Sequence, residues 1–151
     1  THIDNMINDP VSEALELFKS GFNCSQAVLA AFSEECGISK ETALKIACPF
    51  GGGIGGYGRT CGALTGGLMV IGLKYGATKA TNLEAKKLTH EKSRELIEYF
   101  EEKYGTSLCR DLVGFDTSNL SNAEMIAKSP HFQKTCPKFL ETVTIFLEEE
   151  F

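Results

Sequence analysis

Four of the six cysteines in this 151-residue chain stand at equivalent places in the predicted secondary structure. Each lies at, or just before, the N-terminus of a predicted helix, and they are Cys24, Cys61, Cys109 and Cys136. A helix start carries unpaired N–H groups and the positive end of the helix dipole, and both favour a thiolate over a thiol. Because thiolates are the form that binds metals and attacks disulfides, this placement predicts redox or metal chemistry.

The two remaining cysteines, Cys36 and Cys48, fall at the C-terminal ends of predicted helices, where the dipole disfavours a thiolate. We interpret both as core or surface residues. The chain has no Cys-x-x-Cys pair, so neither a thioredoxin-like motif nor a zinc ribbon is predicted. A shared site would require four distant segments to converge. The alternative is that each cysteine acts only as a small buried hydrophobic residue.

A glycine-rich loop precedes Cys61. Its letters match the dinucleotide fingerprint from Gly51 to Gly56 and resemble a phosphate loop from Gly53 to Thr60, with an arginine in place of the usual lysine. Both motifs need a preceding strand, whereas the preceding segment is predicted to be helical. Glycine N–H groups before a helix can nevertheless bind an anion, such as a cofactor phosphate or an anionic cluster. The residues assigned to this role are Gly53, Gly55, Gly56, Arg59 and Gly62, with a plain surface position as the alternative for the arginine.

Hydrophobic periodicity, capping residues and helix breakers predict helices along most of the chain. We expect them over residues 10–20, 23–36, 41–48, 61–75, 82–104 and 121–127, and from residue 136 onward. Cys109 opens a short further segment, and His131 is expected in a loop after Pro130. The helix over residues 61–75 is rich in glycine, which costs roughly 1 kcal/mol per glycine relative to alanine. Close approach to a neighbouring helix or a ligand would offset that cost.

The composition is that of a globular protein, with 42% hydrophobic and 23% charged residues, and no convincing strand, repeat or linker is present. We therefore predict an all-α fold. It should be a single-domain bundle of about six to seven helices over residues 1–151, with the glycine-rich loop between two of them.

The formal net charge of −5 argues against nucleic acid or an anionic membrane as the main partner. The longest nearly apolar run, Ala63 to Leu73, is too short to span a bilayer, and because the given sequence starts with polar residues we expect no signal peptide. Six cysteines would permit a secreted disulfide framework, but a chain of this length can build a core without one. We expect a cytoplasmic protein.

The pattern resembles the C-GCAxxG-C-C family of redox-active proteins, small domains with four shared cysteines. The central motif is Cys61-Gly-Ala-Leu-Thr-Gly66, the upstream cysteine is Cys24, and the downstream ones are Cys109 and Cys136. The resemblance covers about residues 14–143. It implies redox activity without a defined reaction, and related domains in haem-containing proteins imply that the quartet can hold an iron–sulfur centre.

Three functions follow as hypotheses. The first is an electron-transfer protein or oxidoreductase in which the four cysteines ligate an iron–sulfur cluster, most simply [2Fe–2S]. The second is a metal-free thiol–disulfide redox protein that uses the same cysteines and no cofactor. The third is a non-catalytic helical interaction module whose glycine-rich helix packs against a partner. The expected partners are an unidentified redox protein and, through the glycine-rich helix, a second copy in a homodimer.

Overall fold

The computed structural model describes residues 9–150, and the regular elements in that range are helices, with one isolated β-bridge between Thr60 and Leu108. The all-α prediction is confirmed. The elements are α2 (Pro10–Lys19), α3 (Cys24–Ser33), α4 (Lys40–Ala47), the 3-10 turn η1 (Cys48–Phe50), α5 (Gly62–Tyr75), α6 (Leu83–Tyr104), α7 (Cys109–Val113), α8 (Asn122–Ala127), α9 (Ser129–Thr135) and α10 (Pro137–Glu150).

Capping side chains fix where several of these helices begin. Asn23, Ser39, Asn82 and Ser121 each accept a hydrogen bond from the backbone N–H three residues later, at the starts of α3, α4, α6 and α8. These are the starts that the sequence predicts, to within a residue. One end differs, because α3 stops at Ser33 rather than near residue 36 and the chain continues as turns.

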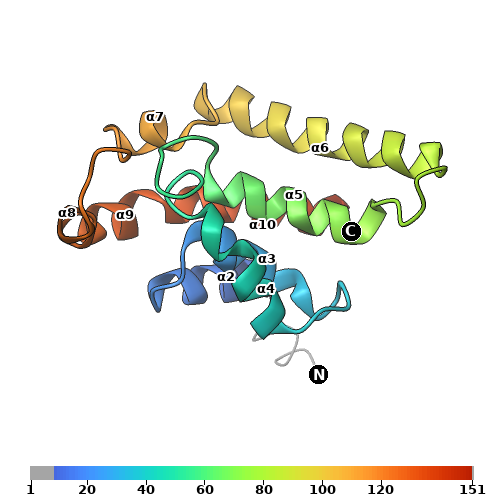
Figure 1. Ribbon diagram of the computed structural model, residues 1–151, viewed down its shortest axis with the longest axis horizontal. Helices are drawn as coiled ribbons and strands as arrows, with labels where there is room; N and C mark the ends of the chain where they lie inside the picture. Colours follow the sequence, from blue (N-terminus) through green and yellow to red (C-terminus); the bar gives the residue numbers. More distant parts are fainter. Residues whose placement is uncertain (1–8, 151) are drawn as a thin grey trace.

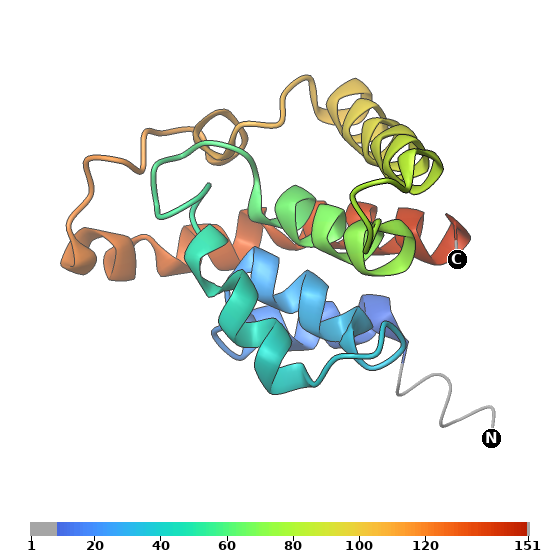
Figure 2. The same ribbon diagram turned by 45° about the vertical axis from the view of Figure 1, so that its right-hand side comes forward.

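Helix α5 lies in the middle of the molecule, between α6 on one side and α2, α3 and α4 on the other, with α10 beside it (Figures 1 and 2). The core forms where these helices meet. Its largest fully buried side chains include Phe32, Phe100, Phe139, Leu64 and Leu96. Helices α8 and α9 extend from the end of this bundle, beyond the start of α10 (Figure 1).

The glycines of α5 allow its backbone to approach its neighbours closely, as predicted. A Cβ on Gly66 would lie 2.8 Å from the carbonyl oxygen of Ser25 in α3, and one on Gly67 would lie 2.7 Å from a methyl group of Val143 in α10. The cost of the poor helix propensity of α5 is therefore offset by its close packing against α3 and α10 of the same chain. These two glycines leave no free small-residue surface for a partner.

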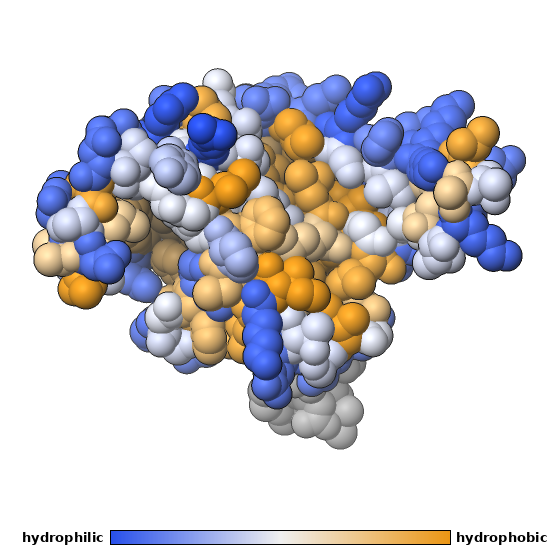
Figure 3. All heavy atoms as spheres, viewed as in Figure 1, coloured by the Kyte–Doolittle hydropathy of each residue, from blue (hydrophilic) through white to orange (hydrophobic). Residues whose placement is uncertain are grey.

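The surface is divided between polar and apolar regions. Figure 3 shows hydrophilic side chains along α6 and apolar ones across the middle of the same face, over α5. No helix in the described range is both long enough and apolar enough to cross a membrane.

Two local predictions are corrected by the structure. His131 lies in α9 and not in a loop, and its Nε2 is 2.8 Å from the carbonyl oxygen of Val113. Pro130 occupies the first turn of α9, where its missing N–H costs no hydrogen bond, so it does not prevent the helix. The prediction of six to seven helices omitted α9 and left the segment at Cys109, now α7, undefined.

Candidate functional site

Cys24 is the first residue of α3, where a capping box holds the chain. The Asn23 side chain accepts from the N–H of Gln26 at 2.9 Å, and the N–H of Asn23 donates to the Gln26 side chain at 3.0 Å. Asn23 also donates its Nδ2 to the carbonyl oxygen of Cys48 at 3.0 Å. The start of α3 is thereby tied to η1, immediately before the glycine-rich loop.

Cys61 and Cys109 are brought together by backbone pairing between the end of the glycine-rich loop and the segment before α7. The N–H of Cys61 donates to the carbonyl oxygen of Ser107 at 2.8 Å, and the N–H of Cys109 donates to that of Arg59 at 2.6 Å. Cys61 is the N-cap residue of α5, and Cys109 is the first residue of α7. Two segments about 50 residues apart in the sequence therefore present their cysteines side by side.

Cys136 lies between two helices. It directly precedes α10, as predicted, and its carbonyl accepts from the N–H of Phe139 at 2.9 Å. It is also the C-cap residue of α9, and its N–H donates to the carbonyl of Phe132 at 2.9 Å. Its position is therefore not a plain helix start, because the unpredicted α9 ends where α10 begins.

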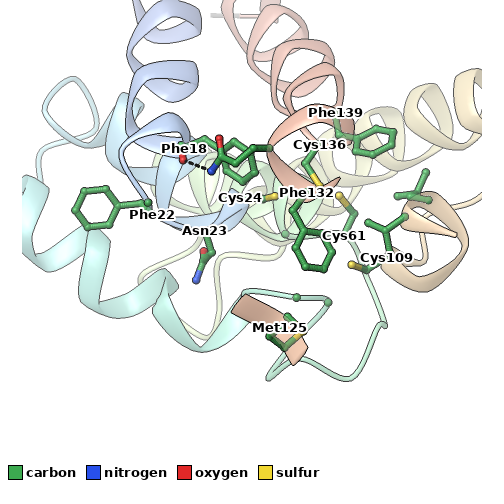
Figure 4. A pocket seen from close by; sticks show the side chains of 17 residues that line it. Phe18, Phe22, Asn23, Cys24, Cys61, Cys109, Met125, Phe132, Cys136 and Phe139 are labelled. Carbon is green, nitrogen blue, oxygen red and sulfur yellow. Dashed lines mark hydrogen bonds between the residues drawn. The ribbon is translucent and has the colours of Figure 1, made fainter. Parts of the chain in front are cut away.

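All four cysteines line one cavity of about 190 Å³. Figure 4 shows the side chains of Cys24, Cys61 and Cys136 directed toward one another, with Cys109 beside them. The four come from α3, the start of α5, α7 and the α9–α10 junction. The remaining walls are mostly apolar and are formed by Phe18, Gly21, Phe22, Asn23, Gly52, Gly53, Gly62, Leu112, Val113, Met125, Phe132, Gln133 and Phe139.

Burial dominates the chemistry of two of these thiols. Cys61 and Cys109 are 4% and 9% exposed. Removal from water raises the pKa of Cys61 to about 12 and that of Cys109 to about 11, because a thiolate is poorly solvated in an apolar cavity. Backbone N–H groups of Ala63 and Leu64, at the start of α5, act in the opposite direction on Cys61. The predicted effect of a helix start is thus present but smaller than the effect of burial.

Cys24 and Cys136 form an unequal pair. Their mutual hydrogen-bonding interaction is the largest influence on both, and it raises the pKa of Cys24 well above its usual value and lowers that of Cys136. Lys138 also lowers the pKa of Cys136. Of the four cysteines, Cys136 is therefore the side chain best suited to exist as a thiolate.

The predicted anion-binding residues separate into two groups. Gly53 and Gly62 line the cavity, whereas Gly55, Gly56 and Arg59 do not. Arg59 is exposed, and its guanidinium lies over the ring of Tyr57, 5.7 Å from the ring centre. Since α4 and η1 precede the loop, the strand that a nucleotide motif requires is not there.

The two glycines at the cavity give cysteines room to pack. A Cβ on Gly53 would lie 2.7 Å from the Cβ of Cys109, and one on Gly62 would lie 3.0 Å from the Cβ of Cys24. Gly53 also has a φ of +76°, which side chains other than glycine rarely adopt. The loop therefore positions cysteines, a role that the nucleotide-like spacing did not indicate.

Cys36 and Cys48 lie outside the cavity. This agrees with their predicted positions at helix C-terminal ends, which set them apart from the other four cysteines. Cys36 is half-buried against the core and Cys48 is exposed. The lining residues that the sequence did not single out include Phe18, Phe22, Phe132 and Phe139, together with Gly52, Met125 and Gln133. No motif marks them, because they come from separate helices and turns that meet only in the folded chain.

Within residues 9–150, no set of three or more His, Cys, Asp and Glu side chains is arranged to hold a metal ion. The four thiols share a cavity without converging on one point. Pairs of thiols in such an enclosure can exchange protons and electrons, and four thiols together offer a soft ligand set.

The comparisons with known proteins agree with this geometry. A family model described as "Putative redox-active protein (C_GCAxxG_C_C)" matches residues 22–150, a range that contains all four cysteines of the cavity. No curated protein and no solved structure matches the chain.

Proposed function

The chain belongs to the C_GCAxxG_C_C family of redox-active proteins, and we propose that its four cavity cysteines form one redox centre that ligates an iron–sulfur cluster of the [2Fe–2S] type. The observation that carries the proposal is the meeting of four cysteines, from four separate segments, in one largely apolar cavity.

The donor set fits this group in number and kind. A [2Fe–2S] cluster takes four thiolates, and the cavity offers Cys24, Cys61, Cys109 and Cys136. When bound, the cluster supplies one-electron transfer. The protein's part is to exclude water with aromatic side chains such as Phe132 and Phe139, and to direct N–H groups at the start of α5 toward Cys61.

Burial makes Cys61 and Cys109 weak acids, and the hydrogen-bonding interaction with Cys136 does the same for Cys24, so binding of a metal must displace the protons of these three thiols. The raised pKa values of Cys24, Cys61 and Cys109 predict that cluster assembly is strongly favoured by higher pH. Cys136, with its lowered pKa, is expected to be the first ligand to lose its proton.

Anaerobic reconstitution with iron and sulfide tests the proposal. The wild-type protein should gain visible absorbance and about two irons per chain. Cys61→Ser should lose most of both, because one ligand is missing. Cys48→Ser is the matched control and should reconstitute normally, since Cys48 is exposed and lies outside the cavity. A wild-type protein that stays colourless and free of iron would refute cluster binding.

A second candidate function rests on the Cys24–Cys136 pair. Oxidation of these two thiols to a disulfide would release two protons and pass two electrons to an external two-electron acceptor, such as another disulfide. The lowered pKa of Cys136 favours this chemistry, because a thiolate is the attacking form. It requires no metal.

Thiol counting separates the two functions. A mild oxidant applied to metal-free protein should remove two thiols, and peptide mapping should join Cys24 to Cys136 if the disulfide function holds. Cys61→Ser should leave this disulfide intact, whereas it should prevent cluster assembly. The redox partner protein, the homodimer and the cytoplasmic location stay predictions.

A further inference from the structure

The cavity has a mouth that can be located from the burial of its lining residues. Its floor is buried and includes Cys61, Cys109, Cys136 and Phe139. The lining residues that reach solvent are Gly21, Phe22, Asn23, Cys24, Gly52, Leu112, Met125, Phe132 and Gln133, so Cys24 alone among the four cysteines is partly exposed. Most of these lining residues belong to two facing segments, the turn between α2 and α3 and the pair α8–α9. The mouth therefore lies between that turn, Gly52 of the glycine-rich loop and α8–α9.

Met125 of α8 makes the first contact across this mouth. It is the one side chain of α8 that is not exposed, and its methyl carbon lies 3.8 Å from the position that a Cβ on Gly52 would take. Figure 4 shows Met125 beside the glycine-rich loop, on the same side of the cavity as Cys109. The neighbouring Ile126 points away and is 75% exposed.

Gln133 of α9 makes the second contact. Its Nε2 donates to the carbonyl oxygen of Phe18, near the end of α2, at 3.0 Å, the hydrogen bond drawn in Figure 4. Residues 18 and 133 are far apart in the sequence, so this bond spans the mouth directly. The adjacent Lys134 is exposed and does not line the cavity.

The segment that carries both contacts is held to its neighbours mainly through α9. Phe132 packs partly buried against the core, and the ring of Phe115 lies 5.4 Å from that of His131 and 5.8 Å from that of Phe132. Nε2 of His131 is 2.8 Å from the carbonyl oxygen of Val113, and Thr117, before α8, places its Oγ1 3.5 Å from the carbonyl oxygen of Gly52. None of the side chains of α8 and α9 is fully buried. Segments with little buried apolar surface open locally at low free-energy cost.

We propose that α8–α9 is a cover over the thiol cavity, held shut by Met125 against Gly52 and by Gln133 on Phe18. Opening of the cover admits a reagent, a metal or a redox partner to the four cysteines, and closure excludes water. Such a cover would control access to the cysteines in either redox chemistry, with or without iron.

Alkylation of the reduced, metal-free protein by N-ethylmaleimide tests the cover, with each cysteine followed by mass spectrometry. In Met125→Ala and in Gln133→Ala, the three buried cavity cysteines, Cys61, Cys109 and Cys136, should react about 5- to 30-fold faster than in the wild type, as expected when one stabilising contact on a local opening is lost. Met125→Leu, which keeps an apolar side chain of similar volume, should stay near the wild-type rate.

The matched controls are Ile126→Ala and Lys134→Ala, each one residue from a holding contact. Both should leave the cavity rates unchanged. Exposed Cys48 serves as the internal reference for reagent activity, and half-buried Cys36 reports unfolding of the whole chain. The cover is refuted if Met125→Ala and Gln133→Ala react at the wild-type rate, if the controls accelerate equally, or if Cys36 accelerates together with the cavity cysteines.

Discussion

Cys24 and Cys136 interact across the cavity in a way that separates their acidities. The Cys24 thiol stabilises a thiolate on Cys136, and burial opposes that charge. The result is a pair with one acidic and one strongly non-acidic member, built from side chains 112 positions apart in the sequence. Such a difference in pKa favours thiol–disulfide exchange, because the more acidic thiol is more often the attacking thiolate and is also the better leaving group.

Cys24→Ala removes the largest cause of the lowered Cys136 pKa. Burial should then raise the pKa of Cys136 above the usual value for a thiol. We expect the pH profile for iodoacetamide alkylation of Cys136 to move to higher pH, and its rate at neutral pH to fall. Cys36→Ala is the control and should leave the profile in place, since Cys36 lies outside the cavity. An unchanged profile in Cys24→Ala would show that Cys24 does not support the Cys136 thiolate.

The glycine-rich loop between η1 and α5 is the element on which the site depends most directly. Its residues from Gly52 to Gly56 all have positive φ, including Ile54 at 67°. This left-handed path returns the chain so that the N–H of Arg59 donates to the carbonyl of Gly53 at 2.9 Å. The loop then pairs with the segment before α7 and sets Cys61 beside Cys109.

Gly53→Ala should disrupt this arrangement more than Gly56→Ala. Both glycines have a similar positive φ, 76° and 78°, so each substitution costs about 1–2 kcal/mol of strain. A Cβ on Gly53 would also lie 2.5 Å from the backbone nitrogen of Arg59 and 2.7 Å from Cys109 Cβ, whereas one on Gly56 meets nothing within 4 Å. Urea unfolding should show Gly53→Ala less stable than Gly56→Ala by about a further 1–3 kcal/mol.

The same pair of variants should differ at the site. Alkylation of Cys109 should change in Gly53→Ala and stay near the wild-type rate in Gly56→Ala. Equal stabilities and equal Cys109 reactivity in the two variants would show that the close approach of Gly53 to Cys109 has no role in positioning it.

Most of the helices could be predicted from the sequence because their signals are local. Asn23 and Ser39 begin helices in the structure as their capping chemistry predicts. Helix α9 was missed because Pro130 indicated a break, although proline is well tolerated in a first turn. The predicted placement at a helix start is confirmed for Cys24, Cys61 and Cys109, and is incomplete for Cys136, which also ends α9. The thiolate character that the dipole argument predicted for the first three is outweighed, because their pKa values are raised.

The site itself was predicted only as a set of cysteines. Spacing carries no information about the pairing that joins residues 58–61 to 107–110, because that pairing depends on the left-handed path of the loop. The strong effect of burial on the pKa values of Cys61 and Cys109 could not be predicted either, because the cavity that buries them is formed by four distant segments. Met125 and Gln133 became recognisable only once the cavity mouth could be located.

At the scale of the whole molecule, α2 and α10 pack along each other and bring opposite ends of the described chain together. Asp9, the N-cap residue of α2, interacts with Glu148 near the end of α10. At the other end of the same two helices, Phe18 and Cys136 line the cavity. The packed helices α2 and α10 therefore carry a carboxyl pair at one end and the cysteine cavity at the other.

This carboxyl pair predicts a pH dependence of stability. Asp9 raises the pKa of Glu148 from 4.5 to about 7, while its own pKa is lowered, so Asp9 stays ionised in both states above pH 4.5. Between pH 4.5 and 7 the native state keeps a proton on Glu148 that the unfolded chain has lost. The free energy of unfolding should therefore fall as pH rises through this window. Both groups are largely solvated, so screening limits the effect to less than about 1 kcal/mol.

Urea unfolding at several pH values should show this slope in the wild type and in Glu149→Gln, and its loss in Glu148→Gln. A slope that persists in Glu148→Gln would assign the pH dependence to other groups.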